Sequence, residues 1–163
     1  MGINIDEMSV LDRRRIEAMI LTPVFKAFAQ ELGEDKTREI MGRTIVRIAR
    51  EQGRTLAKRT GASDLQAFAR AKEPWTRGNT MEVEVLAADD RQYSFDVTRC
   101  RYAEMYNELG IPELGYILSC GRDYAMSQGF NSHIRLSRSQ TIMQGASHCD
   151  FRYVADTDTK NKG

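Results

Sequence analysis

The chain has 163 residues, of which 41% are hydrophobic and 29% charged, a balance typical of one globular domain with its own core. Its 24 basic and 23 acidic residues leave a net charge of +1, which provides no electrostatic footprint for nucleic acid or for a membrane surface. No apolar run approaches the ~20 residues that span a bilayer, and three cysteines without an export signal predict reduced thiols in a bacterial-type cytoplasm.

Two long helices and one short helix are predicted for the N-terminal half. Apolar residues recur at helical spacing from about residue 8 to residue 32, and Pro23 is expected to kink or break this helix. A second helix should begin at Glu34, whose charge suits a helix N-terminus, and should stop at Gly61. The segment Ser63–Gln66 has the form of a capping box and predicts a third helix that ends before the next proline.

The C-terminal half mixes strand and helix patterns. Residues 81–85 and 93–97 alternate around a polar turn, which predicts a β-hairpin. A short helix over 101–110 follows, Pro112 begins another that runs to about residue 128, and two strands over about 134–143 and 149–155 form a second hairpin. The predicted fold class is α+β, with a roughly four-stranded antiparallel sheet covered by helices. We expect one domain over residues 1–156 and a flexible tail over 157–163.

The three cysteines fall where this fold would bring them towards one end of the sheet. Cys100 lies at a strand-to-helix junction, where backbone N–H groups favour a thiolate. Cys120 lies in the helix after Pro112, with Asp123 three residues later on the same face, and Cys149 begins the last strand. Thiolates with one carboxylate suit zinc, so these four residues are candidates for a catalytic cluster or a metal site. Alternatively the thiols are buried small hydrophobes, since no Cys-x-x-Cys pair is present.

Other polar residues near these thiols have both a functional and a structural interpretation. His148, beside the last cysteine, is either a catalytic proton shuttle or a surface residue at a turn. Arg99 and Arg101 flank the first cysteine, where they either hold a substrate carboxylate through bidentate hydrogen bonds or are solvated at a strand end. Asn131 is either a substrate contact or a turn residue.

Three stretches of the sequence resemble the L-2-amino-thiazoline-4-carboxylate hydrolase family: Phe95–Gly115, Leu118–Asn131 and Leu136–Tyr153. They carry a cysteine ahead of Tyr-Ala-Glu, a Cys-x-x-Asp on the next helix, and a final Cys-Asp-Phe-Arg-Tyr. Members of this family are small cytoplasmic bacterial enzymes that open a cyclic amidine ring next to sulfur and give N-carbamoyl-L-cysteine. The resemblance implies that the thiols and the acid inside these motifs belong to one site: Cys100, Cys120, Asp123 and Cys149.

A looser similarity, through Gly145, Cys149 and Phe151, links the chain to the vinyl-reductase-like domain. In phenol-sensing regulators that domain holds zinc through cysteines and a carboxylate, and it binds small aromatic ligands. Here Thr141 stands where a second thiolate ligand would be expected. This similarity implies the alternative function, a non-enzymatic domain that binds or senses a small ligand.

The expected function is therefore a hydrolase that opens a small cyclic amidine or related C–N/C–S heterocycle through a Cys/Asp cluster. Asp123 would act as general acid or base. The cysteines would act either as nucleophile or as ligands of a divalent metal such as zinc that activates water. The expected partners are a carboxylate-bearing heterocyclic substrate and, through the helical N-terminal third, further copies of the chain in a homo-oligomer; no nucleic acid or membrane is expected.

Overall fold

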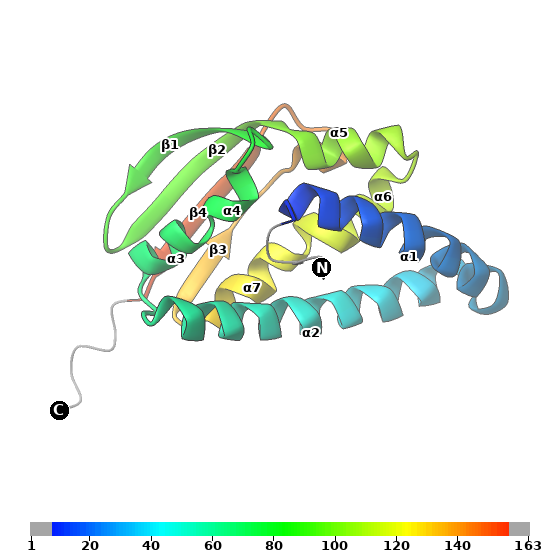
Figure 1. Ribbon diagram of the computed structural model, residues 1–163, viewed down its shortest axis with the longest axis horizontal. Helices are drawn as coiled ribbons and strands as arrows, with labels where there is room; N and C mark the ends of the chain where they lie inside the picture. The colour runs from blue at the N-terminus through cyan, green and yellow to red at the C-terminus, as the bar shows by residue number, and fades with distance from the viewer. Residues whose placement is uncertain (1–7, 157–163) are drawn as a thin grey trace, which may run out of the picture.

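The computed structural model describes residues 8–156 and confirms the α+β class (Figure 1). The predicted tail over 157–163 lies outside the described residues. The N-terminal half consists of helices: α1 (Val10–Leu32), α2 (Glu34–Thr60), α3 (Leu65–Ala71) and α4 (Glu73–Thr76). The C-terminal half contains the sheet and further helical segments: β1 (Met81–Ala88), β2 (Gln92–Cys100), α5 (Arg101–Glu108), α6 (Pro112–Gly115), the π-helical η2 (Tyr116–Cys120), α7 (Arg122–Phe130), β3 (Ile134–Ser137), the 3₁₀ turn η3 (Ile142–Gln144) and β4 (Cys149–Ala155).

The four strands form one antiparallel sheet in the order β1-β2-β4-β3. In its centre Phe95 pairs with Phe151 and Val97 pairs with Cys149. Since side chains alternate along a strand, these four residues share the face that the helices cover, whereas Asp96 points to the opposite face. The register therefore places the Cys149 thiol on the inner face of the sheet, among aromatic rings.

Two hydrophobic clusters form the core. The first joins α3 and α7 to the sheet, where Phe68 lies 5.2 Å from Phe130 and 5.1 Å from Tyr153 between ring centroids. The second lies between the hairpin of α1 and α2 and the segments α5 to η2, around Phe25 and Leu118. Cys100 packs against both clusters, which places its thiol at their junction.

The two long helices form as predicted, and α2 ends at Gly61 in a left-handed conformation. Of the kink or break predicted at Pro23, the break does not occur, because α1 continues through that residue as one helix, and the kink stays a prediction. The carbonyl that proline cannot bind belongs to Met19, an exposed residue, so the missing hydrogen bond lies on a solvent-facing part of the helix. None of the helices within residues 8–156 is long and apolar enough to cross a membrane.

Three other local predictions need correction. Asp64, not Ser63, caps α3, because its Oδ1 accepts the Ala67 N–H at 2.8 Å. The helix expected over 112–128 is divided into α6, η2 and α7, and the Gly121 N–H donates to the carbonyl of Tyr116, five residues back. The third strand ends at residue 137 rather than 143, because the Asp150 carboxylate accepts backbone N–H groups of residues 139 and 140 and turns the chain out of the sheet.

Candidate functional site

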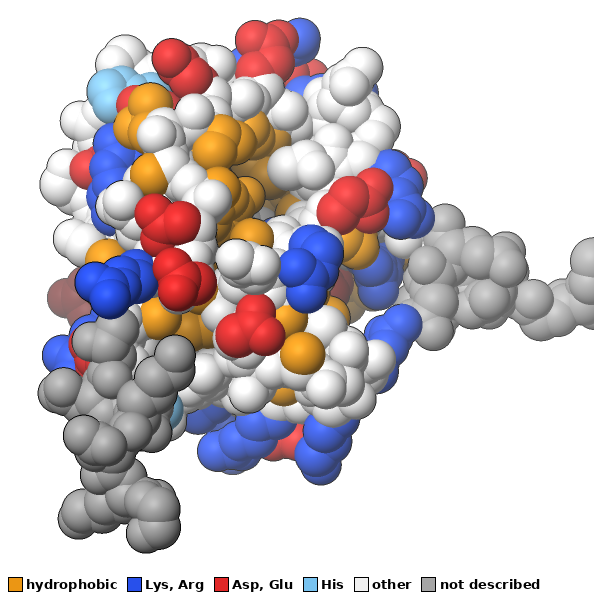
Figure 2. All heavy atoms as spheres, turned by 90° about the vertical axis from the view of Figure 1, so that its left-hand side faces the viewer, with side chains coloured by type: hydrophobic (Ala, Val, Ile, Leu, Met, Phe, Trp, Pro, Cys, Tyr) orange, Lys and Arg blue, Asp and Glu red, His pale blue; other side chains and the backbone are white. Residues whose placement is uncertain are grey.

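A cavity of about 490 Å³ lies between the inner face of β1, β2 and β4 and the helical segments α3, α4, η2 and α7. On the face of the molecule shown in Figure 2, hydrophobic side chains line a hollow bordered by charged residues. Phe95, Phe151, Val83, Val97 and Met126 contribute apolar surface to the cavity. A mostly apolar cavity with a few convergent polar groups is the usual form of a small-molecule site.

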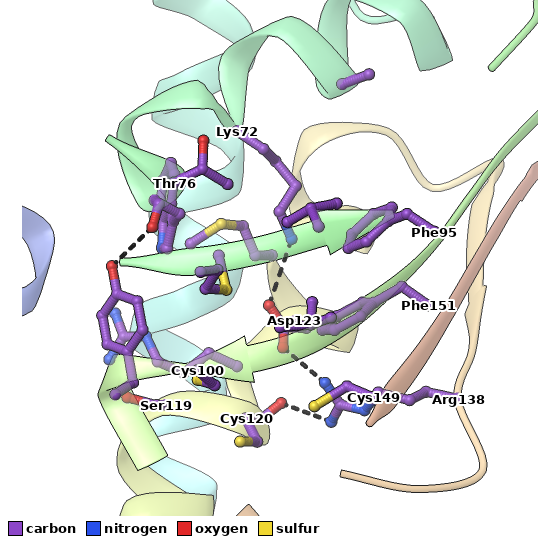
Figure 3. A pocket seen from close by; sticks show the side chains of 18 of the residues that line it. Lys72, Thr76, Phe95, Cys100, Ser119, Cys120, Asp123, Arg138, Cys149 and Phe151 are labelled. Carbon is purple, nitrogen blue, oxygen red and sulfur yellow. Dashed lines mark hydrogen bonds and ion pairs between the residues drawn. The ribbon is translucent and has the colours of Figure 1, made fainter. Parts of the chain in front are cut away.

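Asp123, in the first turn of α7, is held between two cations inside this cavity (Figure 3). Its Oδ2 accepts a hydrogen bond from Arg138 Nη1 at 2.8 Å, and its Oδ1 lies 3.5 Å from Lys72 Nζ. Only 2% of the Arg138 side chain, 11% of Lys72 and 20% of Asp123 are exposed. Burial acts to lower the pKa of Arg138, but the Asp123 carboxylate outweighs it and raises that pKa. The three side chains form a buried charged triad with one positive charge in excess.

Aromatic rings and a backbone carbonyl fix both cations of the triad. Lys72 Nζ lies 5.3 Å from the Phe151 ring centroid and 5.2 Å from that of Tyr153, and it donates a hydrogen bond to the Tyr153 hydroxyl at 3.0 Å. The Arg138 guanidinium lies 4.9 Å from the Phe151 centroid, and its Nη2 donates to the Cys120 carbonyl at 2.9 Å. Because each cation has several partners, the carboxylate between them is held in one orientation.

The three thiols line the same cavity. Burial raises the pKa of Cys100 to about 11, although backbone N–H groups at the start of α5 favour its thiolate. Burial, and then the Asp123 carboxylate, raises the pKa of Cys120 above its usual range. Burial also raises the pKa of Cys149, although its Sγ accepts the Ile142 N–H at 3.2 Å. All three thiols are therefore protonated at neutral pH and present S–H groups rather than thiolates.

The geometry does not fit the metal site predicted on Cys100, Cys120, Asp123 and Cys149. Within residues 8–156, no three His, Cys, Asp or Glu side chains are placed to hold a metal ion together. Asp123 already binds two cationic side chains, and zinc requires deprotonated thiolate ligands. The four residues share a cavity without the arrangement of a metal centre.

Residues 13–153 match the sequence profile of the family described as L-2-amino-thiazoline-4-carboxylic acid hydrolase. The chain belongs to this family. The match includes α1 and α2, so it extends well beyond the three C-terminal stretches that carry the resemblance in the sequence. No curated protein matches the chain.

Two solved structures show the fold of this hydrolase-family chain in other settings. One is the phenol-responsive sensory domain of the transcription activator PoxR, solved with phenol. It is 12% identical to this chain with a TM-score of 0.52, and the aligned region covers 83% of this chain and 73% of the PoxR chain. The other is a trafficking protein particle complex subunit 3 from Naegleria fowleri, covalently bound to palmitic acid. It is 10% identical with a TM-score of 0.50, and the aligned region covers 87% of this chain and 96% of that subunit. At these identities the likeness concerns the fold alone.

Arg99 and Arg101, predicted to anchor the family's carboxylate substrate, do not line the cavity. The Arg99 guanidinium donates a hydrogen bond to Glu104 at 2.7 Å on the exposed surface. Arg101 is also exposed, and its guanidinium lies 3.5 Å from the Gly78 carbonyl. Both side chains flank Cys100 in sequence, but the β2–α5 junction directs them away from its thiol.

Asn131 and His148 also lie outside the cavity. The Asn131 amide donates to the Ser63 carbonyl at 2.8 Å and accepts a backbone N–H at 2.8 Å, so it closes a turn. His148 lies 3.9 Å from Asp96, which points to the opposite face of the sheet from Asp123. The structure thus brings the three cysteines and Asp123 together and places the other four candidates elsewhere.

Sequence reasoning missed the cationic side chains of the cavity. Lys72 follows α3 directly, and Arg138 follows β3 within one of the stretches that resemble the hydrolase family. Arg14 and Arg122 line the cavity from α1 and α7. The only signal was that Arg122 and Arg138 stand inside family-like stretches, and charge alone did not separate them from the chain's many surface arginines.

Proposed function

We propose that this chain is a hydrolase that opens a small, carboxylate-bearing cyclic amidine, with the reacting ring held in the cavity beside Asp123. The observation that carries the proposal is a carboxylate fixed between two buried cations, beside three protonated thiols, in a member of the L-2-amino-thiazoline-4-carboxylic acid hydrolase family. A positioned acid–base group next to proton donors is what hydrolysis of an amidine requires.

The charge of the cavity supports an anionic substrate. Two acidic side chains line it, and one of them, Glu73, is paired with Arg77 at 2.8 Å. Four cationic side chains also line it: Arg14, Lys72, Arg122 and Arg138. A cavity with an excess of positive charge and apolar walls favours a small carboxylate over a neutral or cationic molecule.

The chemistry follows from the positions of these groups. Asp123 removes a proton from a water molecule as its oxygen attacks the amidine carbon, and that proton passes to the ring nitrogen. The Asp123 oxygen near Lys72 is the freer of the two, since its ion contact is 3.5 Å rather than 2.8 Å. Lys72 and Arg138 stabilise the negative charge that develops near the carboxylate.

The ring then opens at sulfur. The C–S bond of the tetrahedral carbon breaks, and a cavity thiol gives its proton to the departing sulfur. The hydroxyl proton on that carbon returns to the thiolate as the carbonyl forms, which leaves an open-chain urea with a free thiol. Because the pKa values of Cys100, Cys120 and Cys149 are raised, the thiols stay protonated, which disfavours direct attack by a thiolate and leaves their S–H groups available as donors.

The test is turnover of 2-amino-thiazoline-4-carboxylate, followed by release of the product thiol. We expect Asp123→Asn to lower kcat by about 100-fold or more, the usual scale for a general acid or base. The matched control is Asp96→Asn, because Asp96 also pairs with an arginine, at 2.8 Å to Arg152, but on the opposite face of the sheet. Equal rates for Asp123→Asn and the unmodified protein, with both folded by circular dichroism, would remove Asp123 from the mechanism.

Ligand binding without turnover is the second candidate function. It is supported by the aromatic walls of the cavity, where Phe95 and Phe151 stack at 4.8 Å between ring centroids, together with the fold shared with a phenol-responsive sensory domain. The same assay separates the two functions, because a sensor domain would bind the heterocycle and release no thiol.

A further inference from the structure

A second cationic group lies in the cavity, apart from the triad of Asp123. Arg14 from α1 and Arg122 from α7 both line the cavity, and both are buried, with 6% and 4% of the residue exposed. A buried guanidinium normally has a carboxylate or several acceptors around it, because an unpaired charge away from water is costly. The two arginines differ in how many such carboxylates and acceptors the protein places around them.

Arg122 lacks such partners among residues 8–156. Its side chain donates one short hydrogen bond to the amide oxygen of Gln52, a neutral and exposed residue, and it forms no ion pair. Its buried Nε has no hydrogen-bond partner. Burial, and then the neighbouring Arg14, lowers the pKa of Arg122 to about 10, so the group remains charged at neutral pH.

Arg14 is only partly compensated. Its Nη1 pairs with Glu17 at 2.6 Å, but 40% of the Glu17 side chain is exposed to solvent, which weakens the pair. Within residues 8–156, Glu17 is the single carboxylate that forms an ion pair with either arginine, and Arg122 feels Glu17 and Asp123 only at longer range. A positive charge remains uncompensated on this side of the cavity.

We propose that Arg122, together with Arg14, binds the carboxylate of the small molecule that occupies this cavity. This inference rests on the proposed function for the identity of the reacting ring, but not for the anion itself. Lys72 and Arg138 are less suited to that task, because both already bind Asp123. With its carboxylate on Arg122, the substrate would turn its ring towards Asp123 and the thiols.

Binding of unreactive probes tests this assignment. Thiazole-4-carboxylate and thiazole-4-carboxamide share one ring and differ in charge, and neither has the amidine carbon that hydrolysis attacks. Trp75, the chain's single tryptophan, lines the cavity, so its fluorescence reports occupancy. We expect the carboxylate to bind about tenfold to a hundredfold more tightly than the carboxamide, the scale of a charge-assisted hydrogen-bonded contact.

Substitutions of single residues show which side chain causes the preference for the carboxylate probe. Arg122→Met should lose most of the preference for the carboxylate, with a remainder from Arg14, whereas Arg122→Lys should keep a larger part of it and Lys72→Met should keep most of it. The matched control is Arg135→Gln, an exposed arginine that pairs with Asp156 outside the cavity. A preference that survives undiminished in Arg122→Met, or that disappears in Lys72→Met instead, would overturn the assignment.

Stability without ligand gives a second readout. Because Arg122 is buried without an acid partner and Gln52 can bind water instead, Arg122→Met should unfold at the same or a higher urea concentration than the unmodified protein. A lower midpoint, or failure to fold, would mean that the guanidinium is structural and would refute the anion site. Since the probes do not react, the preference for the carboxylate stands even if no cyclic amidine is hydrolysed, so the two proposals fail separately.

Discussion

Replacement of Gly53 by alanine should separate the two helices that position the candidate site. A Cβ at Gly53 of α2 would lie 2.2 Å from the Met126 carbonyl oxygen and 2.8 Å from the Phe130 nitrogen of α7. Conversely, a Cβ at Gly129 of α7 would lie 2.0 Å from the Arg50 carbonyl oxygen of α2. These neighbours are backbone atoms, which cannot rotate away as a side chain can.

The loss of stability can be estimated from the overlap between the added Cβ and the backbone atoms of α7. The helices must move apart by roughly 1 Å to restore a normal contact, and overpacking of this kind costs about 1–3 kcal/mol. The better helix propensity of alanine returns up to about 1 kcal/mol. We therefore expect Gly53→Ala to lower the free energy of unfolding by about 1–2 kcal/mol. Because α7 begins with Arg122 and Asp123, turnover should fall as well.

Gly42→Ala is the matched control in the same helix. No atom lies within 4 Å of a Cβ built at Gly42, so only the propensity acts and stability should rise by about 0.5–1 kcal/mol. Urea unfolding followed by far-ultraviolet circular dichroism measures both variants. If Gly53→Ala proved as stable as Gly42→Ala, the close approach of α2 and α7 would be refuted.

Three further predictions concern the charged and thiol groups. Because burial raises the pKa of Cys100, Cys120 and Cys149, iodoacetamide should modify them far more slowly in the native protein than in urea, and rapid alkylation of one native thiol would contradict this. Partial burial acts to raise the pKa of Asp150, but its hydrogen bonds outweigh it and lower the pKa to about 2. Its stabilising contribution is therefore present above the unfolded value of about 3.9 and is lost as pH falls towards 2. Urea unfolding of the unmodified protein and of Asp150→Asn should consequently converge over that window, and a constant difference would be inconsistent with this linkage. Arg138→Met should cost about 3 kcal/mol by leaving Asp123 with one partner, and Asp123→Asn in the same chain should recover part of that loss; strictly additive effects in urea unfolding would argue against the pairing.

The fold was largely predictable because its signals are local. Strand alternation located β1, β2 and β4, and glycine located the end of α2 at Gly61. Where the local signal failed, a contact from elsewhere in the chain decided the structure, as when the Asp150 carboxylate turned residues 139 and 140 out of the third strand. The π-helical η2 is likewise invisible to a pattern of period 3.6.

The candidate site was predictable in part. Motif resemblance brought together three thiols and Asp123, and the four residues do share a cavity. The cations around them were not predictable, because Lys72 and Arg138 meet Asp123 from sequence distances that no helix or strand period covers. At His148, adjacency in sequence to Cys149 was misleading, because this residue directly precedes β4 and its ring lies 3.9 Å from Asp96, which points to the other face of the sheet.

The most direct test of the central claim is mass-spectrometric detection of N-carbamoyl-L-cysteine after the purified, unmodified protein is incubated with L-2-amino-thiazoline-4-carboxylate. The account predicts formation of this product in multiple turnovers, and competition by thiazole-4-carboxylate at the same cavity. Saturable binding of the heterocycle, reported by Trp75, with no product above the uncatalysed rate would contradict hydrolysis and assign the cavity to ligand sensing.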